Sequence, residues 1–288
     1  MCKRRIRTYS DLIEELKENP KLAEVCELNP GCIPDKKIFS RVADRTGIEV
    51  FRQIVIDMTK ECLSPGLMKG RMIGIDGSLI KSNTSAHKNK ETEEYTDKYA
   101  GLYVRGNYLK GVGHLSYKLA DIEYGLPMMV QRRKGSANEN PLLIDIIEDF
   151  YEVYGFYPGL LSVDKGMDSE KNNEFCKEKG IGAYIQARDF GNKELIKTGK
   201  GKTFNPDYVE ITDPRVLEKI ANRRTECERG FSRDKWGYRR DRMPNRGDKE
   251  AELFMLVTMI TTLLTAITAF WVGRADLVRS TSAFKRMH

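Results

Sequence analysis

The sequence predicts a mixed α/β fold in which a β-sheet is flanked by helices, and two observations indicate that class. The first is a set of apolar, strand-like runs, at residues 71–82, 114–123, 126–134, 159–166 and 182–188. The second is that helical patterns separate the last three runs and also occupy both ends of the chain. Three strands, a helix, a strand, a helix and a strand form a mixed α/β order.

The elements can be justified in turn. Residues 10–65 show helical patterns, with Ser10 as a cap and breaks at Pro20 and Pro34. The polar, glycine- and lysine-bearing stretch 83–113 is expected to be an exposed loop. Helices are then predicted at 141–155 and 169–180, because proline at the first position and glycine after the last position are typical helix boundaries.

The last third of the chain predicts two long helices. The first begins at Asp213-Pro214 and is expected to run without a break to Trp236. The second contains residues 253–272, a run of 20 residues without a charge, which meets the length criterion for a membrane span. Four threonines at i, i+3, i+4 and i+7 from Thr258 form a polar stripe on it. We interpret it as a buried core helix, with a membrane helix as the alternative.

Composition sets limits on function. The 288 residues include 49 basic and 42 acidic side chains, and the net charge of +7 favours attraction to a polyanion. Six cysteines without a C-x-x-C pair and three histidines indicate neither a zinc site nor a disulfide framework. The basic start MCKRRIRTYS leads into no apolar segment, which argues against a secretory signal. A cytoplasmic protein with reduced thiols is expected.

Two glutamates in the basic stretch at 223–240 are predicted to face opposite ways. At about 100° per residue, Glu228 falls on the stripe that contains Leu217 and Phe231, whereas Glu226 falls on the opposite side of the helix. The other members of that outward, solvated face are basic: Arg223, Arg229 and Arg233. A carboxylate on a buried stripe needs a cationic partner or a metal, so Glu228 is the candidate functional acid.

Two aspartates end apolar strand-like runs. Asp76 follows MIGI and Asp164 follows LLSV, and strand ends at the edge of a sheet are usual positions for functional groups in α/β folds. Each has a structural alternative, because Asp-Gly between apolar runs is typical of a hairpin turn and Asp164 could form a turn or a cap. Asp121 is a further strand acid.

Together, Asp76, Asp164 and Glu228 predict a divalent-metal site. Three converging carboxylates repel one another and resist ionisation unless cations neutralise them. Mg²⁺ takes oxygen ligands and keeps positions for water and phosphate. Two such ions about 3.5–4 Å apart can activate water and stabilise the leaving oxygen of a phosphodiester. The predicted chemistry is phosphoryl transfer on DNA with Mg²⁺ as cofactor, and Mn²⁺ is expected to substitute.

At these residues the chain resembles the insertion-sequence DDE transposases, which have an RNase H-like catalytic core. Arg224, Glu228 and Lys235 match the last three positions of the family signature Y-x2-R-x3-E-x6-K with the correct gaps, while Ala221 stands at the tyrosine position. The strings IGIDGS and DKGMDS match the motifs around the family's first and second acids. The resemblance extends over roughly residues 35–272.

The resemblance implies that Asp76, Asp164 and Glu228 form a catalytic, metal-binding triad and that Arg224 and Lys235 contact DNA phosphates near the scissile bond. A guanidinium suits bidentate phosphate contact, and a lysine provides a point charge. The remaining candidate DNA-binding residues extend this basic strip: Arg229, Arg233, Arg239 and Arg240, followed by Arg242 and Arg246. An ordinary solvated surface is the alternative for them.

Two aromatic residues, Trp236 and Tyr238, follow Lys235 directly. Such side chains can stack on an unpaired base. Aromatic residues at a helix end more often pack against the protein, and we interpret these two in that way.

The resemblance also implies an organisation into three regions. Residues 1–68 form an N-terminal helical region, with DNA-end binding as a candidate role. Residues 69–275 form the RNase H-like DDE catalytic domain, with a small β insertion at about 182–212, and residues 276–288 form a C-terminal tail. The implied partners are double-stranded DNA, as terminal inverted repeats and target, and further copies of the chain in a synaptic complex. No membrane partner is expected, and the implied location is the bacterial cytoplasm, at the nucleoid.

The implied function is that of a DNA transposase that hydrolyses a strand at the element end and uses the new 3′ hydroxyl to attack target DNA. Two alternatives stay open. A transposase-derived protein could bind DNA without catalysis, and an RNase H-like nuclease could cut DNA without joining it.

Overall fold

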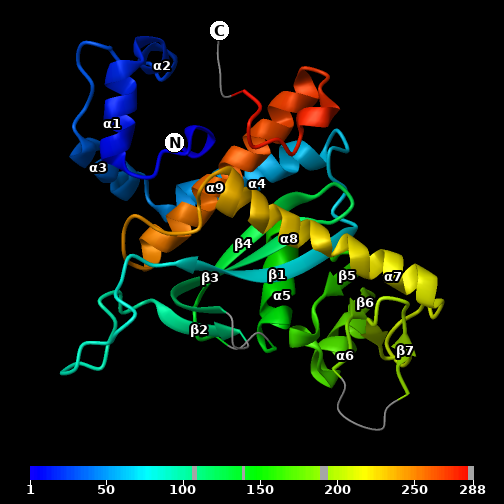
Figure 1. Cartoon of the computed structure of the whole chain (residues 1–288). Coiled ribbons are helices and arrows are strands. Elements are labelled where there is room, and N and C mark those ends of the chain that lie inside the picture. Colours follow the sequence, from blue (N-terminus) through cyan, green and yellow to red (C-terminus); the bar gives the residue numbers. More distant parts are fainter. Residues whose placement is uncertain (106–108, 138–139, 189–193, 285–288) are drawn as a thin grey trace.

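The structure, a computed structural model, describes residues 1–105, 109–137, 140–188 and 194–284. Within these residues the fold centres on a six-stranded sheet of order β2-β3-β1-β5-β6, with β4 also paired to β3 (Figure 1). Its strands are β1 (Met72–Lys81), β2 (Gly101–Arg105), β3 (Leu109–Asp121), β4 (Leu126–Lys134), β5 (Leu160–Val163) and β6 (Gly182–Ile185). The predicted mixed α/β class is confirmed.

The connections in this sheet are of two kinds. β1, β2 and β4 each pair antiparallel with β3, whereas β5 and β6 run parallel to β1. Parallel neighbours need crossover connections, and α5 (Leu142–Tyr154) and α6 (Glu170–Glu178) provide them. This is the mixed, helix-flanked sheet that the resemblance implied. One expectation was wrong: residues 101–105, expected in a loop, form β2 because they pair with residues 109–113.

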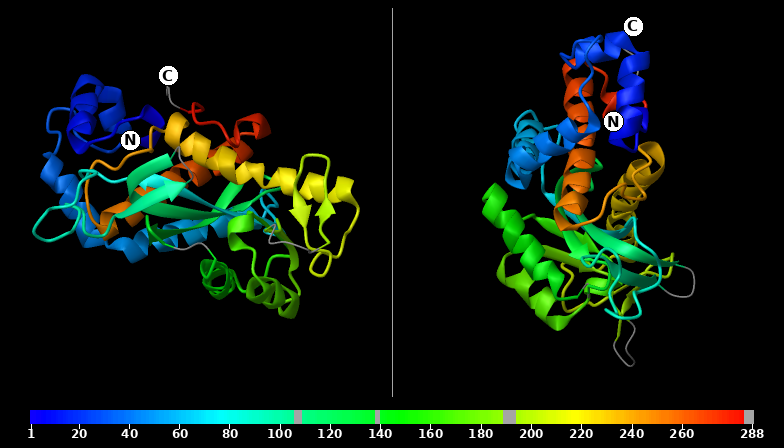
Figure 2. Two further views of the ribbon diagram at one scale, coloured as in Figure 1. Left: turned by 60° about the horizontal axis from the view of Figure 1, so that its bottom comes forward. Right: turned by 90° about the vertical axis from the view of Figure 1, so that its left-hand side faces the viewer.

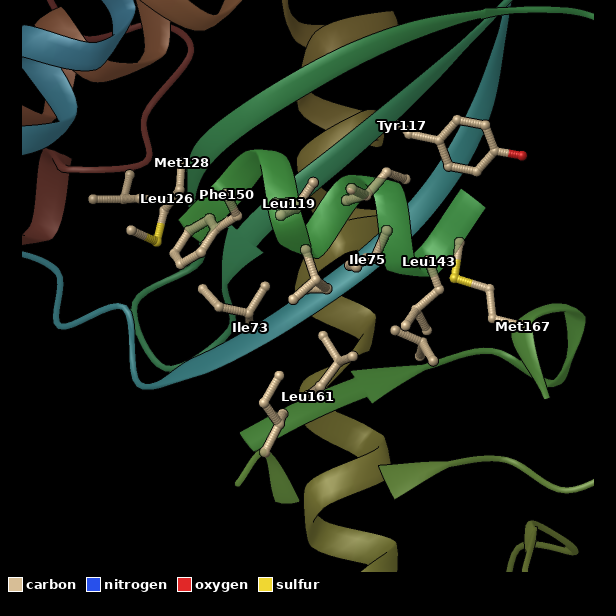
Figure 3. Close-up of a cluster of buried hydrophobic side chains, with 14 of the residues drawn as sticks. Ile73, Ile75, Tyr117, Leu119, Leu126, Met128, Leu143, Phe150, Leu161 and Met167 are labelled. Atoms are coloured by element: carbon tan, nitrogen blue, oxygen red, sulfur yellow. The ribbon is translucent and has the colours of Figure 1, made fainter. Parts of the chain in front are cut away.

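One face of the sheet contributes to the main hydrophobic core. Ile73 and Ile75 of β1 and Leu161 of β5 are buried against Leu143 and Phe150 of α5 (Figure 3). The alternation of strand side chains puts every second residue of β1 on this face. The opposite face lies under α7 (Pro214–Arg223) and α8 (Thr225–Ser232), so helices cover the sheet from both sides (Figure 2, left).

The single long helix predicted from residue 213 to 236 is wrong, because the segment is broken twice. α7 ends at Arg223, and the Thr225 hydroxyl donates a 2.6 Å hydrogen bond to the carbonyl of Asn222 at the junction with α8. Such side-chain bonds compete with the regular helical ladder. After α8, residues Arg233–Gly237 form a π-helical turn, η3. Both breaks change the direction in which later side chains point.

The N-terminal helices are α1 (Tyr9–Glu18), α2 (Pro20–Val25), α3 (Lys36–Thr46) and α4 (Ile48–Leu63), preceded by the short turn η1 (Cys2–Arg4). α4 packs against α9 (Asp248–Trp271), and its Val55 and Cys62 are buried in the same core as the sheet. Helices α1 to α3 lie outside that core (Figure 1).

α9 is the one helix of the described residues that is long and apolar enough to cross a membrane, with 56% of its most apolar window buried in the structure. It contacts β4 as well as α4, and Leu263 and Ala266 are fully buried in the main core. Its Thr258, Thr262 and Thr265 hydroxyls donate to carbonyls one turn earlier in the helix. In this structure α9 is thus a core helix that satisfies its own polar groups.

A small hairpin follows the sheet. β7 (Ile196–Lys197) and β8 (Thr203–Phe204) pair with each other and lie within the expected β insertion, whereas β6 belongs to the main sheet. Phe204 is fully buried and packs with Leu217 and Ile220 of α7. That apolar contact fixes the hairpin against the helix.

Candidate active site

Asp76 and Asp164 occupy neighbouring positions at the point where the parallel pairing of β1 and β5 ends. Asp76 stands inside β1 (Met72–Lys81), so it neither ends a strand nor forms a hairpin turn, whereas Asp164 directly follows β5. β1 and β5 pair with Ile75 opposite Val163, so the aspartates that follow occupy neighbouring positions. Each aspartate accepts a hydrogen bond from the backbone N–H of the residue after it, at 2.9 Å and 2.8 Å. The sheet thus brings together two acids that are 88 positions apart in the chain.

α8 holds Glu228 over the same part of β1. The helix approaches closely because Gly74 has no side chain: a Cβ atom there would lie 2.7 Å from the sulfur of Cys227. Strand alternation puts Gly74 and Asp76 on one face. Burial raises the pKa of the Cys227 thiol to about 12, and the charges of Asp76 and Glu228 add to the rise. Both carboxylates therefore lie within electrostatic reach of the same buried atom.

The carboxylate of Glu228 is paired with Arg224. The guanidinium donates to Glu228 Oε1 at 2.9 Å, and the two side chains are 11% and 53% exposed, with Arg224 the more buried. Arg224 Nε is buried and has no hydrogen-bond partner among the described residues. One NH2 group of the Arg224 guanidinium thus donates to Glu228, while the Nε–H donor is unsatisfied.

The three acids have the donor chemistry of a divalent-metal site, since Mg²⁺ prefers carboxylate oxygens. In the described residues, however, no group of three or more His, Cys, Asp or Glu side chains is close enough to hold a metal ion. Asp76 and Asp164 accept from backbone N–H groups, and Glu228 is bound to Arg224. The residues fit a cation, and a cation site would require these contacts to be exchanged.

The predicted facing of the two glutamates is wrong for both of them. Glu226, expected on the outward face, is 12% exposed, whereas Glu228, expected on the buried stripe, is 53% exposed. Glu226 forms ion pairs with Arg229 and with Arg279, and it lies against Gly125. The break before α8 turns Cys227 rather than Glu228 toward the sheet, and two distant segments then cover Glu226. A helical-wheel projection includes only residues of the helix itself, so it could not show these neighbours.

Two lysines reach the polar face of the sheet beside Asp76. Lys235 Nζ donates to the Ser78 hydroxyl at 2.6 Å, and burial lowers the pKa of this lysine, with the nearby aspartates opposing that effect. Lys118 stands directly opposite Asp76 in the β1–β3 ladder and is ion-paired to Asp234. Asp76 therefore has cations on two sides.

The predicted basic strip divides into exposed and structural residues. Arg229 and Arg239 are exposed, and Arg239 has a left-handed backbone with φ of 57°. Arg233, expected on the outward face, instead donates to the Gly125 carbonyl at 2.8 Å, and its burial lowers its pKa. Arg242 and Arg246 are exposed.

Arg240, predicted to bind DNA, is buried in this structure and makes contacts within the protein. The side chain is buried and donates to the Thr258 hydroxyl at 3.0 Å and to the Phe254 carbonyl at 2.9 Å. Its guanidinium carbon lies 3.3 Å from the centre of the Phe254 ring. Burial lowers the pKa of Arg240. This arginine joins the end of the basic strip to α9.

The two aromatic residues after Lys235 also differ. Tyr238 is buried, as expected for a residue packed at a helix end. Trp236 is 76% exposed, so the expectation that it packs against the protein is wrong. The π-helical turn presents this indole to solvent directly beside Lys235.

Asp121 has a structural role rather than a place among the three acids. It is fully buried and accepts hydrogen bonds from four backbone N–H groups, those of Lys69, Gly70, Glu123 and Tyr124. It therefore fixes the chain entry to β1 and the turn between β3 and β4.

Sequence reasoning missed two residues that support the site. Arg188 donates its backbone N–H to Asp168 at 2.7 Å and its Nε to the Lys165 carbonyl at 2.7 Å, so it fixes the loop that begins with Asp164. Lys202, in the β7–β8 hairpin, donates to Asn222 Oδ1 at 2.8 Å, two residues before Arg224. A signal for Lys202 was present in the run GKGK, although its placement depends on the buried Phe204.

Comparisons with known proteins agree with this fold. The family model of the transposase DDE domain matches residues 75–264, which include all three acids. Because the match extends over more than half of the 288 residues, the chain belongs to the transposase DDE-domain family, a family of enzymes that process DNA in transposition and recombination. No curated protein matches the sequence.

A solved structure extends the comparison. The cryo-EM structure of the piggyBac transposase synaptic complex with hairpin DNA is similar, with a TM-score of 0.50 and 12% sequence identity. The similarity covers 87% of this chain and 59% of that chain, so this chain spans little more than half the length of that protein. At this identity the likeness shows a shared fold.

Proposed function

We propose that the protein is a DNA transposase that uses Asp76, Asp164 and Glu228 to cut a DNA strand at an element end and to join the new 3′ hydroxyl to target DNA. The observation that supports this most directly is the register of β1 and β5, which puts two aspartates at neighbouring positions beneath the helix that carries Glu228. The family match supports the same class of reaction.

In this proposal the three carboxylates would hold Mg²⁺, with Mn²⁺ able to replace it. When bound, such ions supply an activated water and neutralise charge on the reacting phosphodiester. The residues of the chain have separate tasks. Asp76 and Asp164 are fixed by the sheet, so they define the position of the cleaved bond, whereas Glu228 completes the site from α8.

Cations around the acids would bind the DNA backbone. Lys235, next to Asp76 through Ser78, is placed to receive a phosphate close to the cut, and Arg224 offers a planar donor pair that matches phosphate oxygens. Arg229, Arg239, Arg242 and Arg246 would extend the contact along a terminal inverted repeat. Double-stranded DNA and further copies of this chain, in a synaptic complex, are the proposed partners, in the bacterial cytoplasm.

The test is to incubate the purified protein with end-labelled DNA from the flanks of its gene and with Mg²⁺ or Mn²⁺. Joined products support a transposase, and cut products alone indicate a nuclease that does not join strands. A shifted band without either product indicates a DNA-binding protein without catalysis.

The two glutamates of α8 provide a matched pair of variants. Glu228→Gln should reduce cleavage by at least about 100-fold, because metal-assisted charge stabilisation contributes several kcal/mol, while DNA binding persists. Glu226→Gln should leave most of the cleavage, because Glu226 pairs with Arg229 and Arg279 on the other side of Cys227. Equal losses from both substitutions would contradict the assignment of Glu228.

A further inference from the structure

The β7–β8 hairpin brings a lysine to the arginine that holds Glu228. Its turn is closed by hydrogen bonds from Thr198 N–H to the Lys202 carbonyl, 2.9 Å, and from Gly201 N–H to the Thr198 carbonyl, 3.0 Å. Phe204, fully buried against α7, anchors the hairpin. Lys202 then reaches Asn222 in the last turn of α7, at 2.8 Å. The position of Lys202 is therefore fixed by packing.

The neighbourhood of Lys202 contains more positive charge than its ion pairs neutralise. Burial lowers the pKa of Lys202, and the charges of Arg224 and Lys200 lower it further, whereas the charges of Glu218 and Glu228 oppose this effect. Lys200 is ion-paired with Glu218 at 3.5 Å and Arg224 with Glu228 at 2.9 Å, whereas Lys202, among the described residues, donates to the neutral amide of Asn222. Lys202 is thus the cation of this group that has no acid of its own, and an anion beside it would be favourable.

Arg224 provides the second half of such a site. One of its NH2 groups donates a hydrogen bond to Glu228, and its buried Nε has no hydrogen-bond partner among the described residues. An unsatisfied buried donor is unfavourable by about 1–3 kcal/mol. A phosphodiester offers two anionic oxygens, so it can accept from the guanidinium fork and from a lysine at once.

We propose that Lys202 and Arg224 form a phosphodiester-binding site, and that a DNA phosphate bound there replaces Glu228 as the partner of Arg224. The inference rests on the proposed function for its ligand, DNA. Its consequence is a substrate-dependent active site. Without DNA, Arg224 holds the carboxylate of Glu228; with DNA, the phosphate holds Arg224, and Glu228 is released toward Asp76 and Asp164.

Such an exchange couples DNA and cation binding. Because coupling between two sites is reciprocal, DNA should raise the affinity for a divalent cation by the same factor by which the cation raises the affinity for DNA. Coupling of this kind is typically about 5- to 150-fold. The hairpin would thus make the assembly of the catalytic acids depend on bound DNA.

The experiment measures Mn²⁺ binding by electron paramagnetic resonance, with and without a short DNA duplex, and DNA binding by fluorescence anisotropy. No cleavage is needed for either measurement. Wild-type protein should bind Mn²⁺ at least about fivefold more tightly when DNA is bound. An Mn²⁺ affinity that DNA does not change would overturn the proposal.

Three variants locate the effect. Arg224→Gln should bind Mn²⁺ more tightly than wild type in the absence of DNA, because Glu228 loses its partner, and the enhancement by DNA should disappear. Lys202→Gln should weaken DNA binding and reduce the enhancement severalfold. Lys200→Gln is the matched control from the same turn, and it should behave like wild type. Thermal unfolding checks that each variant is folded.

Two results would refute the proposed exchange of Glu228 for a DNA phosphate. If Lys202→Gln and Lys200→Gln change the coupling equally, the hairpin contributes only general charge. If Arg224→Gln retains the full enhancement, Arg224 does not link the two ligands. Cleavage assays separate this inference from the proposed function. Coupling without cleavage would support the phosphate site and contradict the transposase reaction. Cleavage without coupling would support the transposase reaction and contradict the phosphate site.

Discussion

The two faces of β1 differ in what holds them together. Ile73 and Ile75 point into an apolar core made with α5, where burial of hydrocarbon is the stabilising force (Figure 3). Gly74, Asp76 and Ser78 point toward α8, where close approach, charge and hydrogen bonds dominate. The apolar face depends on volume and tolerates many side chains of similar size. The polar face depends on particular atoms in particular places, so its residues have few substitutes.

Substitutions at two consecutive residues test this contrast with the largest expected effects. Asp76→Asn should reduce DNA cleavage by at least about 100-fold, because a metal-binding carboxylate is lost, with little change in melting temperature. Ile75→Ala should lower the free energy of unfolding by about 2–5 kcal/mol, because it leaves a cavity in the core. Cleavage assays and thermal unfolding of both variants provide the comparison.

In that pair, the cleavage rate per folded molecule should stay near the wild-type value in Ile75→Ala. If Asp76→Asn destabilises the protein as much as Ile75→Ala does, the difference between the faces does not exist.

Two consecutive arginines give the next effect in size. Arg240→Ala should lower the free energy of unfolding by about 2–4 kcal/mol, because it removes buried hydrogen bonds and leaves a cavity beside Phe254. Arg239→Ala, at an exposed position, should change stability by less than about 0.5 kcal/mol. Chemical denaturation measures both changes.

DNA binding should show the opposite order for these two variants. Arg239→Ala should reduce the salt dependence of DNA affinity by about one phosphate contact. Arg240→Ala should leave that slope unchanged in the folded fraction, and an equal reduction would indicate that Arg240 leaves its buried position to bind DNA.

Much of the fold was predictable from the sequence, because it depends on local patterns. Apolar alternation located β1, β4, β5 and β6, and the helices between the last three follow from periodicity and from their glycine and proline boundaries. β2 was missed because its apolar part, Leu102–Val104, is only three residues long and lies within a polar stretch. Residues 109–113, with which it pairs, were also expected to be loop. Strand pairing of this kind is a tertiary property.

The candidate site was predictable to the extent that it follows the sheet. Asp76 and Asp164 stand at the ends of apolar runs, and parallel pairing brings such ends together. The orientations of Glu226 and Glu228 could not be derived from a continuous helix, because the helix breaks before Thr225. Glu226 is also covered by Gly125 and Arg279, which are far away in the chain. The burial of Arg240 depends in the same way on α9.

Gly74 allows a smaller perturbation of the polar face. A Cβ atom at this position would lie 2.6 Å from Ile122 Cγ2 and 2.7 Å from the Cys227 sulfur, so Gly74→Ala should move α8 outward. Overpacking of this kind is unfavourable by about 1–3 kcal/mol, and cleavage should fall with it because Glu228 moves too. Ile73→Val, on the opposite face, has a stability cost of about 0.5–1.5 kcal/mol and serves as the control.

For this prediction, adding Cys227→Ala to Gly74→Ala should restore part of the stability, because it removes one of the two obstructing atoms. A double variant as unstable as the sum of its single changes would indicate that α8 does not press on Gly74 through Cys227.

The smallest expected effect concerns the two tryptophans of the chain, which are similarly exposed but differently placed. Trp236 is 76% exposed beside Lys235, and Trp271 is 74% exposed at the end of α9. Trp271→Phe leaves Trp236 as the single indole, and DNA should quench its fluorescence if bases or backbone approach this turn. Trp236→Phe leaves Trp271, whose fluorescence should not respond to DNA.

Trp236→Ala should weaken DNA binding by a factor equivalent to about 1 kcal/mol, the lower end for an aromatic contact with a base. Equal quenching of both single-tryptophan proteins would mean that DNA approaches both tryptophans alike. The polar face of the sheet, which α8 covers, would then lose its assignment as the DNA-binding side.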